Sequence, residues 1–124
     1  MKLFILIAGI ALSAAGAAHA ACSYPRAPEK LPDGNTATME EMMAAQKAVR
    51  QYDADINAYV ACIKLEHAQS VSQESTGLTE EQKKDRERVQ VQKHNAAIDE
   101  LEAVAARFNE QVKAFKAKNE KKKS

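Results

Sequence analysis

The sequence predicts an all-α fold, an antiparallel two-helix hairpin of coiled-coil type that follows an extended proline-rich arm. Three observations support this prediction. Two long segments repeat apolar residues at heptad spacing, a stretch rich in serine separates them, and all three prolines precede the first segment. Alanine, glutamate, lysine and glutamine are abundant, a composition that favours helices over sheets.

Residues 1–20 have the layout of a secretory signal peptide. Lys2 precedes an apolar run, and Ala18-His19-Ala20 forms an A-x-A cleavage site, so we expect export and cleavage before Ala21. The run is too short for a transmembrane helix, and we expect no stable membrane insertion after cleavage. Acylation of Cys22, as in a lipoprotein, is an alternative. His19 stands where lipoprotein signals usually carry Leu, and acylation would leave Cys62 unpaired.

Residues 21–37 are expected to form the extended arm. Pro25, Pro28 and Pro32 lack amide donors and favour polyproline geometry, which excludes a helix here. Pro32-Asp33-Gly34 is typical of a turn, with Pro32 at its second position and Gly34 free to take positive φ.

The first helix is expected over residues 38–69. Thr38 and Glu41 have the spacing of a capping box at its start. Its apolar stripe comprises two interleaved series at heptad spacing: Met42, Val49, Ile56 and Ile63, with Ala45, Tyr52 and Tyr59.

The second helix is expected over residues 79–118, after a loop at 70–78. Thr79 and Gln82 form another capping box, and Glu80 is spaced to pair with Lys84. The apolar stripe again has two series: Val91, Ile98, Ala105 and Val112, with His94, Leu101, Phe108 and Phe115. Residues 119–124 are expected to form a frayed basic tail.

A short loop makes the two helices antiparallel, so that their apolar stripes face each other in one hairpin, residues 38–118. Reflection about the loop places Ile56 near His94, Val49 near Leu101 and Met42 near Phe108. Val112 and Phe115 then extend past the start of the first helix, and we expect the arm to cover them.

Cys22 and Cys62 are the only cysteines, and an exported protein is expected to join them in a disulfide. The arm is long enough for this disulfide. Residues 38–62 span about 36 Å as a helix, and residues 22–38 can reach about 50 Å in polyproline form, so the arm can fold back along the helix to Cys62. The alternative is a redox-active pair, but the C-x-x-C spacing typical of such pairs is absent.

Charge and motifs exclude several classes of function. Without Lys2, 17 basic residues remain against 17 acidic ones, whereas a nucleic-acid binder needs a basic surplus. The sequence contains no nucleophile–base set, no phosphate-binding loop and no carboxylate pair in a context that would form a pocket. We therefore expect a protein that is not an enzyme, needs no cofactor and binds no nucleic acid.

Two groups of residues are candidate metal ligands, although we expect no metal. Met39, Met42 and Met43 share one helix face and could bind Cu(I), or could instead fill the core beside Phe108 and Phe115. His94 is either a pH-sensitive or metal-binding residue, or a half-buried side chain hydrogen-bonded to a tyrosine or backbone group.

The lysines near the C-terminus allow contact with anionic lipid or cell-wall polymer, or simply a solvated helix end. They are Lys116, Lys118, Lys121, Lys122 and Lys123.

Six short motifs are distributed along the chain after residue 20. They are Cys22-x-x-Pro25, Leu31-Pro32-Asp33-Gly34, Met42-x-x-Ala45-Gln46-x-x-Val49-x-x-Tyr52, Cys62-Ile63, His94-Asn95-Ala96-Ala97-Ile98-Asp99 and Ala106-Arg107-Phe108-Asn109-Glu110-Gln111. Together they resemble a family of small exported proteobacterial helical proteins with no assigned function. The resemblance covers nearly the whole chain after residue 20 and implies a periplasmic protein of a Gram-negative bacterium, without implying any activity, ligand or site residue.

We accordingly expect a periplasmic protein with an interaction or structural role, with a protein partner or self-association. Val60, Val71 and Val104 are expected to form an exposed apolar edge that favours association. The alternative function is Cu(I) handling by the three methionines.

Overall fold

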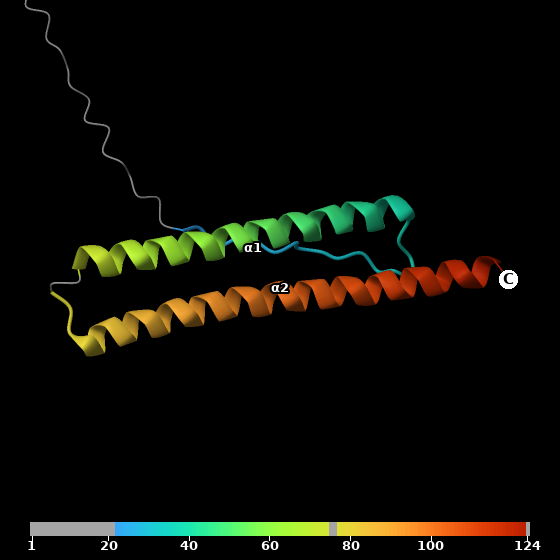
Figure 1. The fold of residues 1–124 in the computed structure, drawn as a ribbon. Coiled ribbons are helices and arrows are strands. Elements are labelled where there is room, and N and C mark those ends of the chain that lie inside the picture. Colours follow the sequence, from blue (N-terminus) through green and yellow to red (C-terminus); the bar gives the residue numbers. More distant parts are fainter. Residues whose placement is uncertain (1–21, 75–76, 124) are drawn as a thin grey trace, which may run out of the picture.

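The computed structural model describes residues 22–74 and 77–123. The predicted signal peptide and part of the predicted loop lie outside these residues. Two long helices, α1 (Met39–Glu74) and α2 (Glu80–Lys123), pack side by side and antiparallel, which confirms the helical hairpin (Figure 1). We call the end where α1 begins and α2 finishes the open end, and the opposite end the loop end.

The arm runs back along the hairpin from the open end towards the middle of α1 (Figure 1). There Cys22 and Cys62 form a disulfide pair whose Cα atoms are 5.8 Å apart. Beside it, the rings of Tyr24 and Tyr59 pack edge to face, with centroids 5.0 Å apart. Ala27 and Leu31 continue the contact with the core. The arm is therefore a third layer of the fold, fixed to α1 at its first residue.

The arm enters α1 through a turn that begins at Asp33. The Asp33 carbonyl accepts hydrogen bonds from the amides of Thr36 (3.1 Å) and Ala37 (2.8 Å), and its carboxylate accepts one from the Asn35 amide (2.9 Å). The turn thus starts two residues later than the predicted one, which has Pro32 at its second position and starts at Leu31.

Gly34 was predicted to be free to take positive φ, but it does not use that freedom. Its role is close approach to α2, because a Cβ atom on Gly34 would lie 2.8 Å from the Phe115 amide nitrogen and still closer to the Gln111 carbonyl oxygen. The Gly34 amide also donates a hydrogen bond to Gln111 Oε1 (2.9 Å). Only a residue without a side chain lets the arm touch the backbone of α2 here.

The predicted apolar stripe of α1 is the one that the structure buries. Met42, Ala45, Tyr52, Ile56 and Ile63 are all buried. Val49 and Tyr59 are half-buried and pack against the same core. The helix continues past the predicted end at Gln69 to Glu74. Ser70 lies within it and accepts a hydrogen bond from Arg86 of α2 (3.3 Å).

The apolar stripe of α2 is rotated from the predicted one. Phe108 and Phe115 are buried as predicted, but Ala97 and Val104 take the place of Ile98 and Ala105 at its centre. Val104, predicted to be exposed, is 1% exposed, whereas Val91, predicted to be in the stripe, is 45% exposed. The arm explains the rotation, because α2 must face both α1 and the arm.

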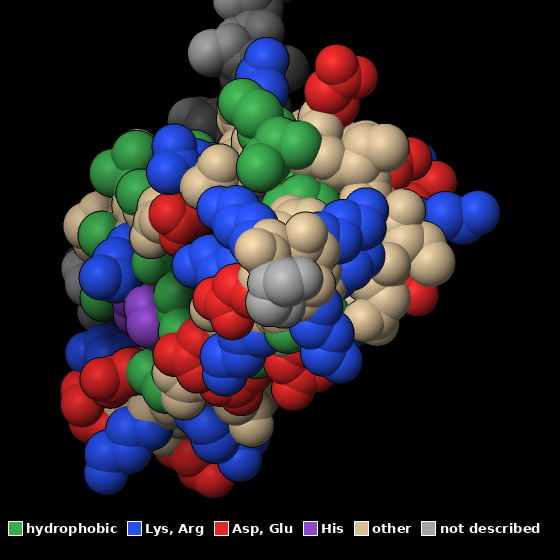
Figure 2. Space-filling model, turned by 90° about the vertical axis from the view of Figure 1, so that its right-hand side faces the viewer, with side chains coloured by type: hydrophobic (Ala, Val, Ile, Leu, Met, Phe, Trp, Pro, Cys, Tyr) green, Lys and Arg blue, Asp and Glu red, His purple; other side chains and the backbone are tan. Residues whose placement is uncertain are grey.

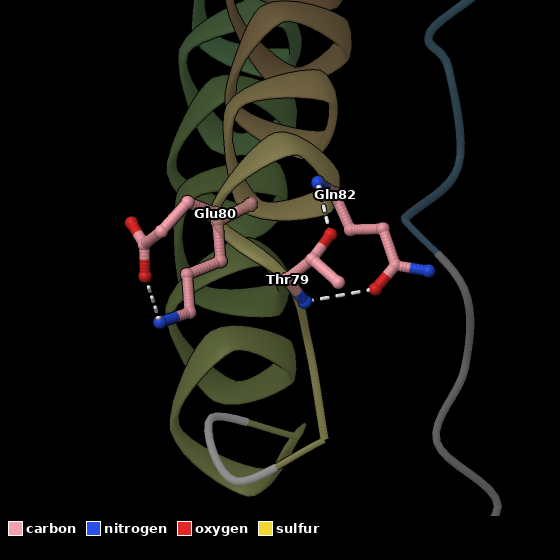
Figure 3. Close-up of polar contacts among 4 residues, drawn as sticks. Thr79, Glu80 and Gln82 are labelled. Atoms are coloured by element: carbon pink, nitrogen blue, oxygen red, sulfur yellow. Dashed lines mark hydrogen bonds and ion pairs between the residues drawn. The ribbon is translucent and has the colours of Figure 1, made fainter.

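Both predicted capping boxes are present. The Glu41 amide donates to Thr38 Oγ1 (3.2 Å) and the Thr38 amide to Glu41 Oε2 (2.7 Å). Thr79 and Gln82 make the same pair of bonds at 3.2 and 2.9 Å (Figure 3). Glu80 pairs with Lys83 at 2.8 Å instead of the predicted Lys84.

At its other end, α2 stays helical through most of the predicted frayed tail, to Lys123. No glycine or proline interrupts this stretch, and its lysines suit the negative end of the helix dipole.

Candidate binding groove at the open end

An apolar groove of about 390 Å³ lies between the start of α1 and the end of α2. We call it the methionine groove. Its apolar lining consists of Met39, Met42, Met43, Phe108, Val112 and Phe115. Its polar rim consists of Gln46, Lys116, Asn119, Glu120 and Lys123. Small-molecule and peptide sites are commonly apolar hollows of this size with a few polar groups at the edge.

The three methionines meet in this groove but differ in exposure. Met42 is 6% exposed and belongs to the core cluster of Phe108 and Phe115, as the packing alternative predicts. Met39 and Met43 are 57% and 62% exposed. One methionine therefore fills the core, and two offer flexible apolar surface to solvent.

The arm and the methionine groove lie on opposite sides of α2. Gln111 and Lys118, three to four residues either side of Phe115, face the arm: Gln111 accepts from Gly34, and Lys118 Nζ donates to the Ala37 carbonyl (3.0 Å). Lys118 Nζ also lies 5.3 Å from the centre of the Phe115 ring, a cation–π distance. Lys116 and Lys123 lie on the groove side. The arm thus closes one side of the hairpin and leaves the other open.

Positive charge predominates around the groove. Besides Lys116 and Lys123, an adjoining hollow on α1 shares Met43 and Gln46 with the groove and is lined by Lys47 and Arg50. Glu120 is the one acidic residue lining either hollow. Figure 2, which looks onto the open end, shows Lys and Arg side chains around the end of α2 with hydrophobic side chains beside them. An occupant of the groove would therefore meet an apolar surface and a mainly cationic edge.

His94 is half-buried, as expected, but it contacts neither Tyr52 nor Tyr59 by a hydrogen bond. Its Nδ1 lies 3.3 Å from the Asn95 side-chain oxygen. The core cluster around Ile56 contains Ala97 instead of the predicted His94. Among the described residues, no group of three or more His, Cys, Asp or Glu side chains is arranged to hold a metal ion.

Two other hollows lie towards the loop end. One, of about 260 Å³, is lined by residues of both helices, including the mixed charges Glu66, Asp85, Arg86 and Lys93. The other is larger, about 830 Å³, but its lining among the described residues lies between Leu78 and Arg88 on a single segment of the chain and is largely charged. No helix in the described ranges is both long and apolar enough to cross a membrane.

The Tyr52 hydroxyl is the one buried side-chain polar atom in the described residues that lacks a hydrogen-bond partner. Burial raises the pKa of Tyr52 to about 12, with smaller effects from the charge and hydroxyl of nearby Tyr24 and from Glu100. The Tyr24 hydroxyl is close enough to influence the Tyr52 pKa but does not meet the geometry of a hydrogen bond with it. A buried phenol without a hydrogen-bond partner reduces stability. It does not line the methionine groove, so we treat it as part of the core.

Three roles were not predicted from the sequence: the close approach of Gly34 to α2, the hydrogen bond between Gln111 and the arm, and the hydrogen bond from Lys118 to the Ala37 carbonyl. The rim was also missed as a site, although its lysines were noted as a tail. A signal was present, because Val112, Lys116, Asn119 and Lys123 follow one another at spacings of three and four along one face of α2.

The chain matches no known protein family, and neither curated proteins nor solved structures include a significant match to it.

Proposed function

We propose that this chain is an exported, non-enzymatic protein of the periplasm that binds another protein through the methionine groove. Export is supported by the pattern of residues 1–20 and by the cysteine pair, since disulfides persist in oxidising compartments. The chain lacks the residue sets of the common catalytic mechanisms in its sequence, which supports a binding role.

The observation that carries the proposal is the exposure of Met39 and Met43 beside buried Phe108 and Phe115. Methionine side chains are unbranched and polarisable, and they adapt to the shape of an apolar partner. Proteins that bind amphipathic helices use such surfaces as grooves. A concave apolar surface that the arm leaves open is suited to the same use.

Photo-crosslinking in the periplasm tests this function. A photoreactive amino acid at position 43 should yield a covalent adduct with one defined protein, identified by mass spectrometry. The same amino acid at Lys113, an exposed position on α2 outside the groove, is the matched control. No adduct, or the same adducts from both positions, would contradict a role for the groove.

Cu(I) binding is the second candidate function, favoured by the observation that all three methionines line one groove. Thioethers are soft ligands that select Cu(I). Replacing Met39 and Met43 by leucine separates the two functions, because leucine keeps the apolar surface and removes the sulfur. If the protein handles copper, a Cu(I) chelator should remove Cu(I) from this variant under conditions in which the wild type retains it. If the groove binds a protein, a photoreactive amino acid at a neighbouring groove position such as Lys116 should give the same crosslinks in the variant as in the wild type.

A further inference from the structure

We infer that the occupant of the methionine groove is an amphipathic helix of another protein whose apolar stripe is bordered by Asp and Glu residues. This inference rests on the proposed function and specifies the partner. It depends on the shape of the groove and on the charges around it.

The shape fits a helix. The groove and its adjoining hollow extend from Met39 to Gln51 on α1 and from Phe108 to Lys123 on α2. At 1.5 Å per residue these stretches are about 18 and 22 Å long. A helix of about 12 to 15 residues has the same length. Two antiparallel helices with an open side accept a third helix, as in a helical bundle.

Exposure of the two methionines agrees with this occupant. Met39 and Met43 are four residues apart, so they form one ridge on α1, while Phe108, Val112 and Phe115 form the facing surface on α2. A helix with apolar residues at positions i, i+3 or i+4, and i+7 would pack between these two rows. The arm cannot be that occupant, because it fills the opposite side of the hairpin.

The charges favour acidic flanks. Lys116, Lys123, Lys47 and Arg50 surround the groove and its adjoining hollow, against Glu120 alone. None of the four cations forms a hydrogen bond or ion pair with another described residue. Acidic residues beside the apolar stripe of a partner would meet these charges, whereas basic residues would be repelled. The hollow of about 260 Å³ towards the loop end has two acidic and two basic residues, so it favours neither an acidic nor a basic partner.

Selection from a displayed library of 15-residue helical peptides tests the inference on the full disulfide-bonded protein. We expect enriched peptides to combine apolar residues at i, i+4 and i+7 with neighbouring Asp or Glu, and to bind more weakly as salt is raised. The Met39→Glu/Met43→Glu variant should weaken binding by about tenfold or more. These residues are exposed, and circular dichroism and the melting temperature will show whether the fold is intact.

Charge reversal is the sharper test. The Lys116→Glu/Lys123→Glu variant should shift the enriched peptides from acidic to basic flanks. Lys113→Glu makes a similar charge change on α2 outside the groove and should leave the preference unchanged.

Three results would overturn the inference. Enriched peptides that depend on Met39 and Met43 but carry neutral or basic flanks would disprove the acidic partner and leave the proposed function intact. A dimer of this chain at micromolar concentration, lost in Met39→Glu/Met43→Glu, would make a second copy the occupant, again with the groove as a protein-binding surface. Peptides that ignore Met39 and Met43, or no enrichment at all, would contradict both proposals.

Discussion

Gly34 lies where the arm touches the backbone of α2, with a space there too small for a methyl group. We predict that Gly34→Ala lowers the free energy of unfolding by about 2 kcal/mol, because the arm must move away from α2. Gln111→Ala removes the hydrogen bond from Gly34 but adds no atoms, and should lower the free energy of unfolding by about 1 kcal/mol. Urea unfolding of the oxidised proteins measures both. Equal stability of Gly34→Ala and wild type would mean that the arm does not approach α2 so closely.

Tyr52 makes the free energy of unfolding fall as the pH rises through the alkaline range. Its pKa is about 12 in the folded protein, against an ordinary value of 10.0, mainly because burial disfavours the phenolate. The folded state therefore holds the proton more tightly, and this contribution to stability is complete below pH 10 and lost as pH rises from 10 to 12. The loss amounts to about 1.4 kcal/mol per pH unit in that window.

The Tyr52→Phe variant isolates this effect. Tyr52→Phe should not show the part of the stability loss at alkaline pH that Tyr52 causes. Tyr59→Phe, which keeps Tyr52, should still show it. At pH 7 we expect Tyr52→Phe to be as stable as wild type or more stable by up to about 1 kcal/mol, because the hydroxyl lacks a partner among the described residues. Denaturant unfolding between pH 7 and 12 measures both effects. Parallel loss of stability in wild type and Tyr52→Phe would show that another group is responsible.

The two capping boxes have the same chemistry but different surroundings. Thr38 begins α1 next to the core cluster of Ala37 and Met42, whereas Thr79 begins α2 in a charged, solvated stretch. We predict that Thr38→Ala lowers global stability by about 1 kcal/mol. Thr79→Ala should instead increase amide hydrogen exchange over residues 80–86 with little change in the melting temperature. Similar global losses in both variants would mean that the start of α2 contributes to the core.

The helices show how far the sequence predicts this fold. The stripe of α1 was predicted correctly because Tyr52 and Ile56, at its centre, have polar residues on both sides, which leaves a single choice of face there. In α2, apolar residues are adjacent at Ala97 and Ile98 and at Val104 and Ala105, so two neighbouring faces satisfy the same period. The choice between them depends on the arm, a long-range contact that helical periodicity does not contain.

The candidate site was predicted only in its parts. The methionine cluster and the C-terminal lysines were each recognised from spacing. The methionines and the lysines line the same groove because of the antiparallel register of the two helices and because the arm occupies the other side of the hairpin. The contact between Gly34 and the α2 backbone fixes that side, and the sequence indicated only a turn there.

The disulfide fixes the start of the arm to α1 and thereby affects the stability of the whole molecule. Cys22 and Cys62 are 40 positions apart, and closing a loop of this size stabilises a protein by about 4 kcal/mol in the chain-entropy model. We predict that the Cys22→Ala/Cys62→Ala variant loses about that much, a large share for a thin two-helix protein. Thermal unfolding measures the loss, and the intact mass of the wild type checks that Cys22 carries no lipid. An unchanged melting temperature would mean that noncovalent contacts alone hold the arm.

The central claim is that the arm closes one side of the hairpin while the methionine groove stays open on the other. Met39, Met42 and Met43 are the only methionines after Met1, so their ¹³C-labelled methyl groups report on the groove directly. With a soluble paramagnetic agent added to the purified, disulfide-bonded protein, we predict strong broadening of the Met39 and Met43 methyl signals and protection of Met42. Equal broadening of all three signals, or protection of all three, would contradict this arrangement.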